Sequence, residues 1–419
     1  MTRKIPLAWL QLTREKPRLA VAMAGIAFAD ILMFMQLGFR EALFNGNVRM
    51  HAALDGEIVL INPKTNALLS MKSFSQRRLY QALVFPGVKS VHPIYLAFSD
   101  WRNPTACDKS PKPVTKSDEV PLPCRPRTIQ VMGINPRENV FTLPGVQENL
   151  AKTKMPDVVL FDSGSRPEFG KVATDFKTGK TVSTEVGGRR VKVGGIFEMG
   201  ASFGADGNLI TSDLNFLRIL KDKNRQYGLI DIGLIKLKPG TNPDLIVKQM
   251  RDFYCQKKTT TFAKDDENYQ CQDVKVFTKQ EFVDFEKDYW ASSTPIGFIF
   301  TLGTVIGFIV GTVIVYQILY TEVADHLAEY ATLKAMGYTQ NYLLLVVFQE
   351  ALILAIVGYF PGFAFALFQY NMARSATLLP LFMTVSRAVT VLILTILMCT
   401  ISGGIAVRKL QAADPADIF

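Results

Sequence analysis

The sequence has few of the residues on which enzymes usually depend. Only three histidines occur among its 419 residues, and no HExxH motif is present. The string TDFKTGKT at 174–181 ends like a phosphate-binding loop, but Thr174 stands where that motif requires its first glycine. We therefore interpret 174–181 as a surface turn. We expect no catalytic residue, no cofactor and no bound metal in this chain.

Charge is also missing from long stretches of the chain. Residues 295–320 and 388–407 contain no charged residue, residues 342–373 contain only Glu350, and residues 19–39 contain only Asp30. About 20 apolar residues are enough to cross a bilayer as a helix. The four runs are therefore predicted to be transmembrane helices, at residues 19–44, 295–320, 342–373 and 388–407.

The first of these runs has a second interpretation. A basic start, an apolar stretch and the string AFAD would also suit a secretory signal cleaved near Ala29. The apolar character continues through ILMFMQLGF, which is longer than the core of a signal needs. This length favours a retained membrane span.

Residues 45–291 contain no run of membrane length and are expected to form a mixed α+β domain between the first two spans. Short β-branched segments separated by turn residues predict strands, at 56–61, 127–134, 157–162, 189–197 and 229–238. Helices are predicted around 72–84, 212–222 and 242–253. Pro, Lys and Ser are abundant in 102–126, which is therefore predicted to be a loop.

The basic N-terminus indicates which side of the membrane each segment occupies. Five of the first 18 residues are Lys or Arg, and basic flanks stay in the cytoplasm. With four spans, the cytoplasmic segments are then 1–18, a loop at 321–341, and 408–419. The domain at 45–291 and the short loop 374–387 are expected outside, in a multi-pass protein.

The cysteines agree with an exported domain. Cys399 falls in the last span, and the other four lie within 45–291 as two pairs that are close in sequence. In an oxidising compartment an even number of cysteines indicates disulfides. Of the three possible connectivities we choose the local one, Cys107–Cys124 and Cys255–Cys271. A zinc site is the alternative, but no CxxC spacing supports it.

Most of the net charge belongs to the exported domain. Residues 45–291 hold 36 Lys/Arg against 28 Asp/Glu, so they carry +8 of the total of +10. An acidic protein partner or anionic lipid headgroups would suit this charge, and so would an ordinary solvated surface. Nucleic acid is not expected as a partner on that side of a membrane.

Polar and small residues stand out inside the predicted spans. Asp30 and Glu350 are costly in lipid, so each is expected to face other helices, either for function or for a structural hydrogen bond. Gly303, Gly307 and Gly311 form a flat stripe on the second span. This stripe is predicted to pack against the first span or to form the seam of a homodimer.

The loop between the second and third spans contains the most specific pattern. Residues 329–337 read EYATLKAMG, and the resemblance is to a motif of the form E-I-G-[TV]-L-[RK]-A-[LM]-G, with Tyr330 as the departure. This motif and the layout of one span, a large exported domain and three spans resemble the type VII ABC permeases, to which MacB and FtsX belong. Glu350, Gly358 and Gly362 resemble the start of that family's third span. The N-terminal stretch most resembles the DevC branch, from cyanobacteria.

The resemblance implies a coupling helix that docks on a separate ATPase. The expected coupling residues are Leu327, Glu329, Tyr330, Ala331, Thr332, Leu333, Lys334, Ala335, Met336 and Gly337. A helix lying on lipid would be expected to carry more Lys, Arg and large apolar residues than this one. Gly337 is predicted to end the helix and turn the chain back towards the membrane.

The resemblance further implies the permease of a tripartite exporter that works by mechanotransmission. Its partners would be an ABC ATPase like DevA, which binds ATP and Mg, a membrane-fusion protein like DevB, and a TolC-type outer-membrane channel, with the permease as a homodimer. The cargo would be an envelope glycolipid or another amphiphile. An FtsX-like regulator that moves no cargo is the alternative, and an anchored sensor would need a cytoplasmic domain that the predicted topology does not provide.

Overall fold

The computed structural model describes residues 9, 14, 16–105, 125–221, 225–257, 269–326, 329, 332–333 and 336–412. The chain divides into two compact units. Unit 1 consists of Met1–Ala42 and Thr294–Phe419, and unit 2 consists of Leu43–Ser293.

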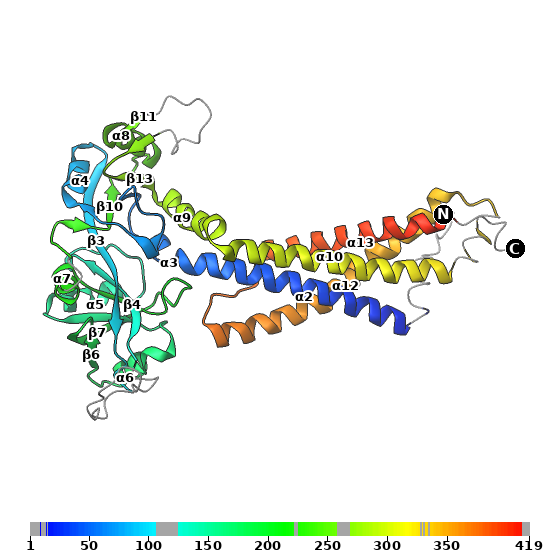
Figure 1. Ribbon diagram of the computed structural model, residues 1–419, viewed down its shortest axis with the longest axis horizontal. Helices are drawn as coiled ribbons and strands as arrows, with labels where there is room; N and C mark the ends of the chain where they lie inside the picture. The colour runs from blue at the N-terminus through cyan, green and yellow to red at the C-terminus, as the bar shows by residue number, and fades with distance from the viewer. Residues whose placement is uncertain are drawn as a thin grey trace. The chain divides into compact units, whose positions relative to one another are not determined.

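Unit 1 is a bundle of four long helices that run alongside one another (Figure 1). Each contains a segment long and apolar enough to cross a membrane, and together with the mixed unit 2 they confirm the predicted fold class of a membrane protein. The helices are α2 (Lys16–Asn47), α10 (Pro295–Asp325), α12 (Gln340–Thr377) and α13 (Val385–Ala412). α2, α12 and α13 extend past the predicted runs at both ends, and α10 extends past its run only at its C-terminal end, to Asp325.

Unit 2 is built on a nine-stranded sheet with the order β13-β1-β10-β3-β4-β8-β5-β7-β6. Of the pairs of adjacent strands, β4–β8 and β5–β7 are parallel, and the others are antiparallel. Its strands are β1 (Ile58–Ile61), β3 (Val88–Trp101), β4 (Arg127–Ile134), β5 (Val158–Asp162), β6 (Ser183–Val186), β7 (Arg189–Phe197), β8 (Asn208–Ser212), β10 (Ile232–Leu237) and β13 (Lys275–Thr278).

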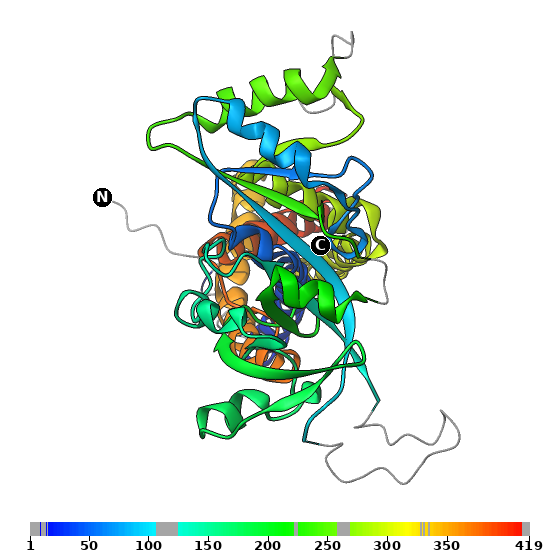
Figure 2. The same cartoon turned by 90° about the vertical axis from the view of Figure 1, so that its left-hand side faces the viewer.

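The long strand β3 organises this sheet and crosses much of unit 2 (Figure 2). It pairs with β10 along its first half and with β4 along its second half. At its end Trp101 also pairs with Val186 of β6, so the sheet curls back on itself between β3 and β6. Buried side chains form a hydrophobic core on each face of the sheet.

Shorter elements complete unit 2. Two small sheets pair β2 (Phe74–Ser75) with β9 (Leu229–Ile230), and β11 (Cys255–Lys257) with β12 (Tyr269–Cys271). The helices are α3 (Arg49–Ala52), α4 (Gln76–Gln81), α5 (Val146–Asn149), α6 (Val172–Lys177), α7 (Asp213–Ile219), α8 (Pro243–Tyr254) and α9 (Lys279–Asp288). The 3₁₀ turns are η1 (Leu68–Ser70), η2 (Ala82–Val84), η5 (Leu150–Lys154) and η6 (Pro167–Phe169), and η8 (Tyr289–Ser293) is a π-helical turn.

The predicted elements of unit 2 are present with shifted bounds. The helix expected around 72–84 is shorter, since 74–75 form a strand and only Gln76–Gln81 are α-helical. The strand expected at 229–238 is divided at Asp231. The carboxylate of Asp231 is buried and accepts hydrogen bonds from the amide of Leu96 at 2.7 Å and the hydroxyl of Ser73 at 2.9 Å.

Candidate functional site

The candidate site is the coupling loop (residues 321–341) together with the helix ends around it in unit 1. Its first residues form the last turn of α10, which ends at Asp325. Of the ten predicted coupling residues, the structure describes Glu329, Thr332, Leu333, Met336 and Gly337. The other five, Leu327, Tyr330, Ala331, Lys334 and Ala335, lie outside the described residues.

The end of a helix lies at Gly337. The amide of Met336 donates to the carbonyl of Thr332 at 3.0 Å, and the amide of Tyr338 donates to the carbonyl of Leu333 at 3.1 Å. Between them Gly337 has a φ of +94°. This combination is a Schellman motif, in which a left-handed glycine ends the helix and satisfies its last carbonyls. A side chain at 337 would strain this backbone.

Apolar side chains at this helix end face solvent. Met336 is 64% exposed, and the rings of Tyr338 and Tyr342 lie 5.0 Å apart with both residues partly exposed. Large exposed apolar groups lower stability in water unless a partner covers them. The surface is therefore suited to docking against a protein groove.

A charge cluster lies at the start of the coupling loop and consists of Glu322, Asp325, His326 and Glu329 of the loop together with Arg18 of α2. The guanidinium of Arg18 lies 3.5 Å from the carboxylate of Glu322 and 2.6 Å from that of Asp325. His326 lies 3.5 Å from Glu322 and 3.1 Å from Glu329 through its two ring nitrogens. The cluster thus joins the start of α2, the end of α10 and the coupling loop.

The sequence prediction used Arg18 only as a marker of topology and did not pair it. The partners lie about 300 positions away in the chain, so no local pattern connects them. The available indication was that both Arg18 and Glu322 stand within a turn of an apolar run. Charged residues at such positions are expected to seek partners at the membrane surface.

The two predicted intramembrane acids are both buried between helices. The hydroxyl of Thr395 donates to Asp30 at 2.6 Å, and the second carboxylate oxygen of Asp30 has no hydrogen-bond partner in the described part of the chain. Neither oxygen of Glu350 has one there either.

The glycine stripe of α10 packs largely on α2. A Cβ added to Gly303 would lie 2.5 Å from the side chain of Gln36, and one added to Gly307 would lie 3.5 Å from Leu32 and Met33. At Gly311 it would meet Ala29 and also Met398 of α13. The absence of side chains at these positions lets α2 and α13 approach α10 closely.

Gly358 and Gly362 of α12 have a similar role on another face of α2. A Cβ at Gly358 would lie 2.7 Å from Ile26, and one at Gly362 would lie 2.9 Å from the Cβ of Asp30. α2 is therefore surrounded by close helix contacts with α10 and α12. A change in the position of either neighbour has to be accommodated by α2.

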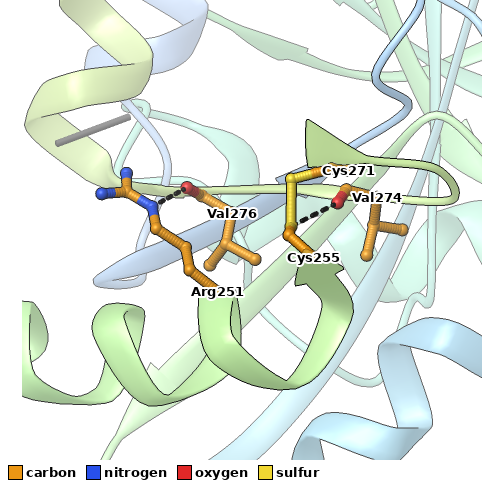
Figure 3. Close-up of a disulfide and its surroundings, with 5 residues drawn as sticks. All are labelled: Arg251, Cys255, Cys271, Val274 and Val276. Carbon is orange, nitrogen blue, oxygen red and sulfur yellow. Dashed lines mark hydrogen bonds between the residues drawn. A yellow bond between two sulfur atoms is a disulfide. The ribbon is translucent and has the colours of Figure 1, made fainter. Parts of the chain in front are cut away.

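Unit 2 contains the disulfide between Cys255 and Cys271, one of the two predicted pairs (Figure 3). The bond joins β11 to β12 where these strands pair. Close by, Arg251 donates to the carbonyl of Val276 at 3.0 Å and to Glu281 at 2.8 Å, which ties α8 to β13 and α9. Cys107 and Cys124 lie outside the described residues, so their bond stays a prediction.

Two strings that resemble catalytic motifs have structural roles. In 174–181, α6 ends at Lys177, Gly179 has a φ of +81°, and Lys180 pairs with Asp175 at 2.9 Å at the surface. The string GASFG at 200–204 has the spacing of a serine-hydrolase elbow. Such an elbow lies between a strand and a helix, whereas this string is followed by the strand β8. The hydroxyl of Ser202 accepts a hydrogen bond from the amide of Ala205 at 3.0 Å.

Among the described residues, no group of three or more His, Cys, Asp or Glu side chains could hold a metal ion. The acidic and basic residues at the candidate site instead pair with one another.

The region that contains this site resembles a known protein family. Residues 301–415 match the FtsX-like permease C-terminal family. This part of the chain is similar to an FtsX-like permease domain. It includes the coupling loop, most of α10, and all of α12 and α13, so the resemblance found in the sequence to the permeases that include FtsX is supported here.

Solved structures of single domains are also similar to the chain, at low sequence identity. The periplasmic region of MacB from Actinobacillus actinomycetemcomitans is 12% identical, and the match covers 57% of this chain and 94% of that one with a TM-score of 0.31. The extracellular domain of the ABC-type transporter YknZ from Gram-positive bacteria is 13% identical, with 53% and 100% covered and a TM-score of 0.30. No curated protein matches the chain.

Proposed function

We propose that this chain is the permease subunit of a type VII ABC exporter, in which a separate ATPase supplies the energy. The observation that carries the proposal is the coupling loop, whose EYATLKAMG motif lies within the FtsX-like permease domain and ends in an exposed Schellman turn at Gly337. A short helix that ends in exposed apolar side chains suits the groove of a soluble partner.

In this proposal two copies of the chain bind two ATPases in the bacterial inner membrane. Closure of the ATPases around ATP moves the two coupling loops, and α10 and α12 carry that movement to α2 through their close glycine contacts. Unit 2 lies in the periplasm and acts on a membrane-fusion protein and a TolC-type duct. The cargo is an envelope glycolipid or a similar amphiphile, as in the DevC branch that the N-terminus resembles.

A second candidate is an FtsX-like regulator that passes ATPase motion to a periplasmic enzyme and moves no cargo. The match of residues 301–415 suits both functions equally, because it covers the part that would bind the ATPase. The two differ in what unit 2 contacts. Crosslinking of unit 2 in intact cells separates them, since an exporter would yield a fusion protein and a regulator would yield a cell-wall hydrolase.

The test of the proposal is the loss of ATPase coupling after a change in the coupling loop. Met336→Glu places a charge on the exposed apolar surface, and Ala331→Arg adds bulk and charge within the motif. Burying an unpaired charge in a groove costs several kcal/mol, so both variants are expected to lose co-purification of the ATPase and stimulation of its ATP hydrolysis. Lys334→Ala is expected to have a milder effect.

The matched control is Met155→Glu, because Met155 is 65% exposed, as Met336 is, but lies in unit 2. It is expected to leave ATPase binding unchanged. The proposal fails if the wild-type chain, purified with the ABC ATPase of its own organism, neither binds that ATPase nor raises its activity. It also fails if Met336→Glu and Ala331→Arg behave like Met155→Glu.

A further inference from the structure

The chain passes into unit 2 from two helices, from α2 at Leu43 and from α10 at Thr294. The coupling loop is joined covalently to α10 and α12, but not to α2. Movement of the loop must therefore reach α2 through side chains. The glycine stripe provides one contact, but a flat stripe of small residues resists separation of two helices more than sliding along their axes. A directional contact is needed to fix the axial position of α2.

Arg18 makes such a contact. Its guanidinium faces two carboxylates of α10 that are three residues apart and so lie on one face of the helix, at 3.5 Å from Glu322 and 2.6 Å from Asp325. The planar fork of arginine can engage both carboxylates together, which a lysine cannot do with the same geometry.

The surroundings strengthen this contact beyond that of an ordinary surface pair. The Glu322 side chain is only 5% exposed and that of Arg18 is 31% exposed, so water screens the pair incompletely. Arg18 also lies beside the last turn of α10, where the helix dipole favours a positive charge. The contact is therefore worth more than a pair such as Arg14–Glu329, which is 3.9 Å apart and exposed on both sides.

The contact continues into the coupling loop. His326 lies between Glu322 and Glu329, so one side chain of α10 faces both the Arg18 guanidinium and the loop's histidine. A displacement of the loop thus changes the surroundings of Glu322 directly. It is transmitted to Arg18 across a single side chain.

We propose that Arg18 is the positioning residue that makes α2 follow the coupling loop. Arg18 and the two carboxylates form a clamp that sets the axial register between α2 and α10. The inference rests on the proposed function, because it assigns the contact through which motion of the ATPase reaches α2. It predicts that loss of the clamp separates ATPase binding from ATPase stimulation.

The test measures both properties for the full chain in nanodiscs with its ATPase. Arg18→Glu is expected to co-purify with the ATPase as the wild type does, because the docking surface is unchanged, but to lose about tenfold in stimulation, equivalent to about 1.4 kcal/mol of coupling. The double variant Arg18→Glu/Asp325→Arg restores opposite charges and is expected to recover most of that loss. Arg18→Lys, which keeps the charge without the fork, should lie between them.

The matched control is Arg14→Glu, which reverses the charge four residues earlier in the exposed pair Arg14–Glu329. This variant is expected to change the stimulation of ATP hydrolysis less than about twofold. Stimulation retained by Arg18→Glu, or a double variant as impaired as the single one, overturns the inference while leaving the proposed function intact. Loss of ATPase binding by Arg18→Glu also overturns it, since that indicates a general structural role. A wild-type chain that stimulates no ATPase overturns both.

Discussion

Buried carboxylates are treated differently in the two units. In unit 2, Asp162 accepts hydrogen bonds at 2.8–2.9 Å from the amides of Met199, Gly164 and Gly200 and from the side chain of Asn208. In unit 1, Asp30 accepts a single bond from Thr395, and both oxygens of Glu350 lack a partner among the described residues.

Glu286 of unit 2 resembles Asp162 in this respect. One of its oxygens accepts the amide of Leu68 and the other accepts the indole N–H of Trp290, each at 2.8 Å, and His51 lies 3.5 Å away. Full satisfaction of a buried acid indicates a role in holding the fold. A buried acid whose carboxylate oxygens lack partners stabilises little, so Glu350 in α12 and Asp30 in α2 are candidates for a functional role.

The largest expected effect that would test this comparison is the loss of Asp162. Asp162→Ala leaves several buried donors without an acceptor and removes the negative charge facing Arg49, so we expect destabilisation of unit 2 by about 3–5 kcal/mol. Urea unfolding followed by tryptophan fluorescence measures it. Asp206→Ala removes an exposed surface pair instead and should cost less than about 1 kcal/mol. Equal effects of the two variants would contradict the comparison.

A smaller effect is expected at Glu286. Glu286→Ala leaves the amide of Leu68 and the indole of Trp290 unpaired, which costs about 2–3 kcal/mol. Hydrogen exchange should then rise in α3 and α9, since this side chain lies between them. The control is Asp284→Ala, an exposed acid on the same helix. A stability of Glu286→Ala equal to that of the control would show that the buried network holds nothing together.

Removing charge from the acids of unit 1 is expected to affect stability less. Asp30→Asn keeps an oxygen for Thr395, and Glu350→Gln removes no hydrogen bond that the structure shows, so each should change stability by less than about 1 kcal/mol. Both variants should nevertheless lower export. Thermal unfolding in detergent and a transport assay check the two parts. Large destabilisation by Glu350→Gln would place it with the structural acids of unit 2.

The smallest expected effect concerns a surface carboxylate. The hydrogen bond from Arg189 at 2.5 Å, together with the charge of Arg218, lowers the pKa of Asp157 below its ordinary 3.8. Its stabilising contribution is therefore present above pH 3.8 and is lost as the pH falls from there through the lowered value. Asp157→Asn should be less stable than the wild type at pH 7, by less than about 1 kcal/mol after solvent screening. The difference should shrink in unfolding curves below pH 3.8.

The elements that the sequence predicted well have strong local patterns. The four apolar helices and the β-branched strands β1, β4, β5 and β7 belong to this group. β3 was missed because Pro93 interrupts it, and proline usually argues against a central strand. Pro93 is tolerated because the pairing of β3 with β4 begins only at Ile94. β8 was missed because only Leu209 and Ile210 of its five residues are apolar, although all five are buried.

One missed helix was available from the sequence. Residues 278–281 read TKQE, the pattern of a capping box, and in the structure Thr278 and Glu281 cap α9 in that way. The candidate site was predictable only where its motif is continuous in the chain, as at Gly337. The contacts of Arg18, Asp30 and Glu350 join distant helices, so they depend on packing that no local pattern contains.

The length of α2 has a mechanical consequence. A helix of 32 residues is about 48 Å long, whereas the hydrocarbon layer is about 30 Å thick. Even at a tilt of about 40°, the steep end of the usual range, such a helix extends about 37 Å along the membrane normal. About 7 Å of this extent lies beyond the hydrocarbon layer, so at least one turn of α2 in total lies outside it. A stiff helical segment of this kind passes a displacement along its axis with less loss than a flexible linker would.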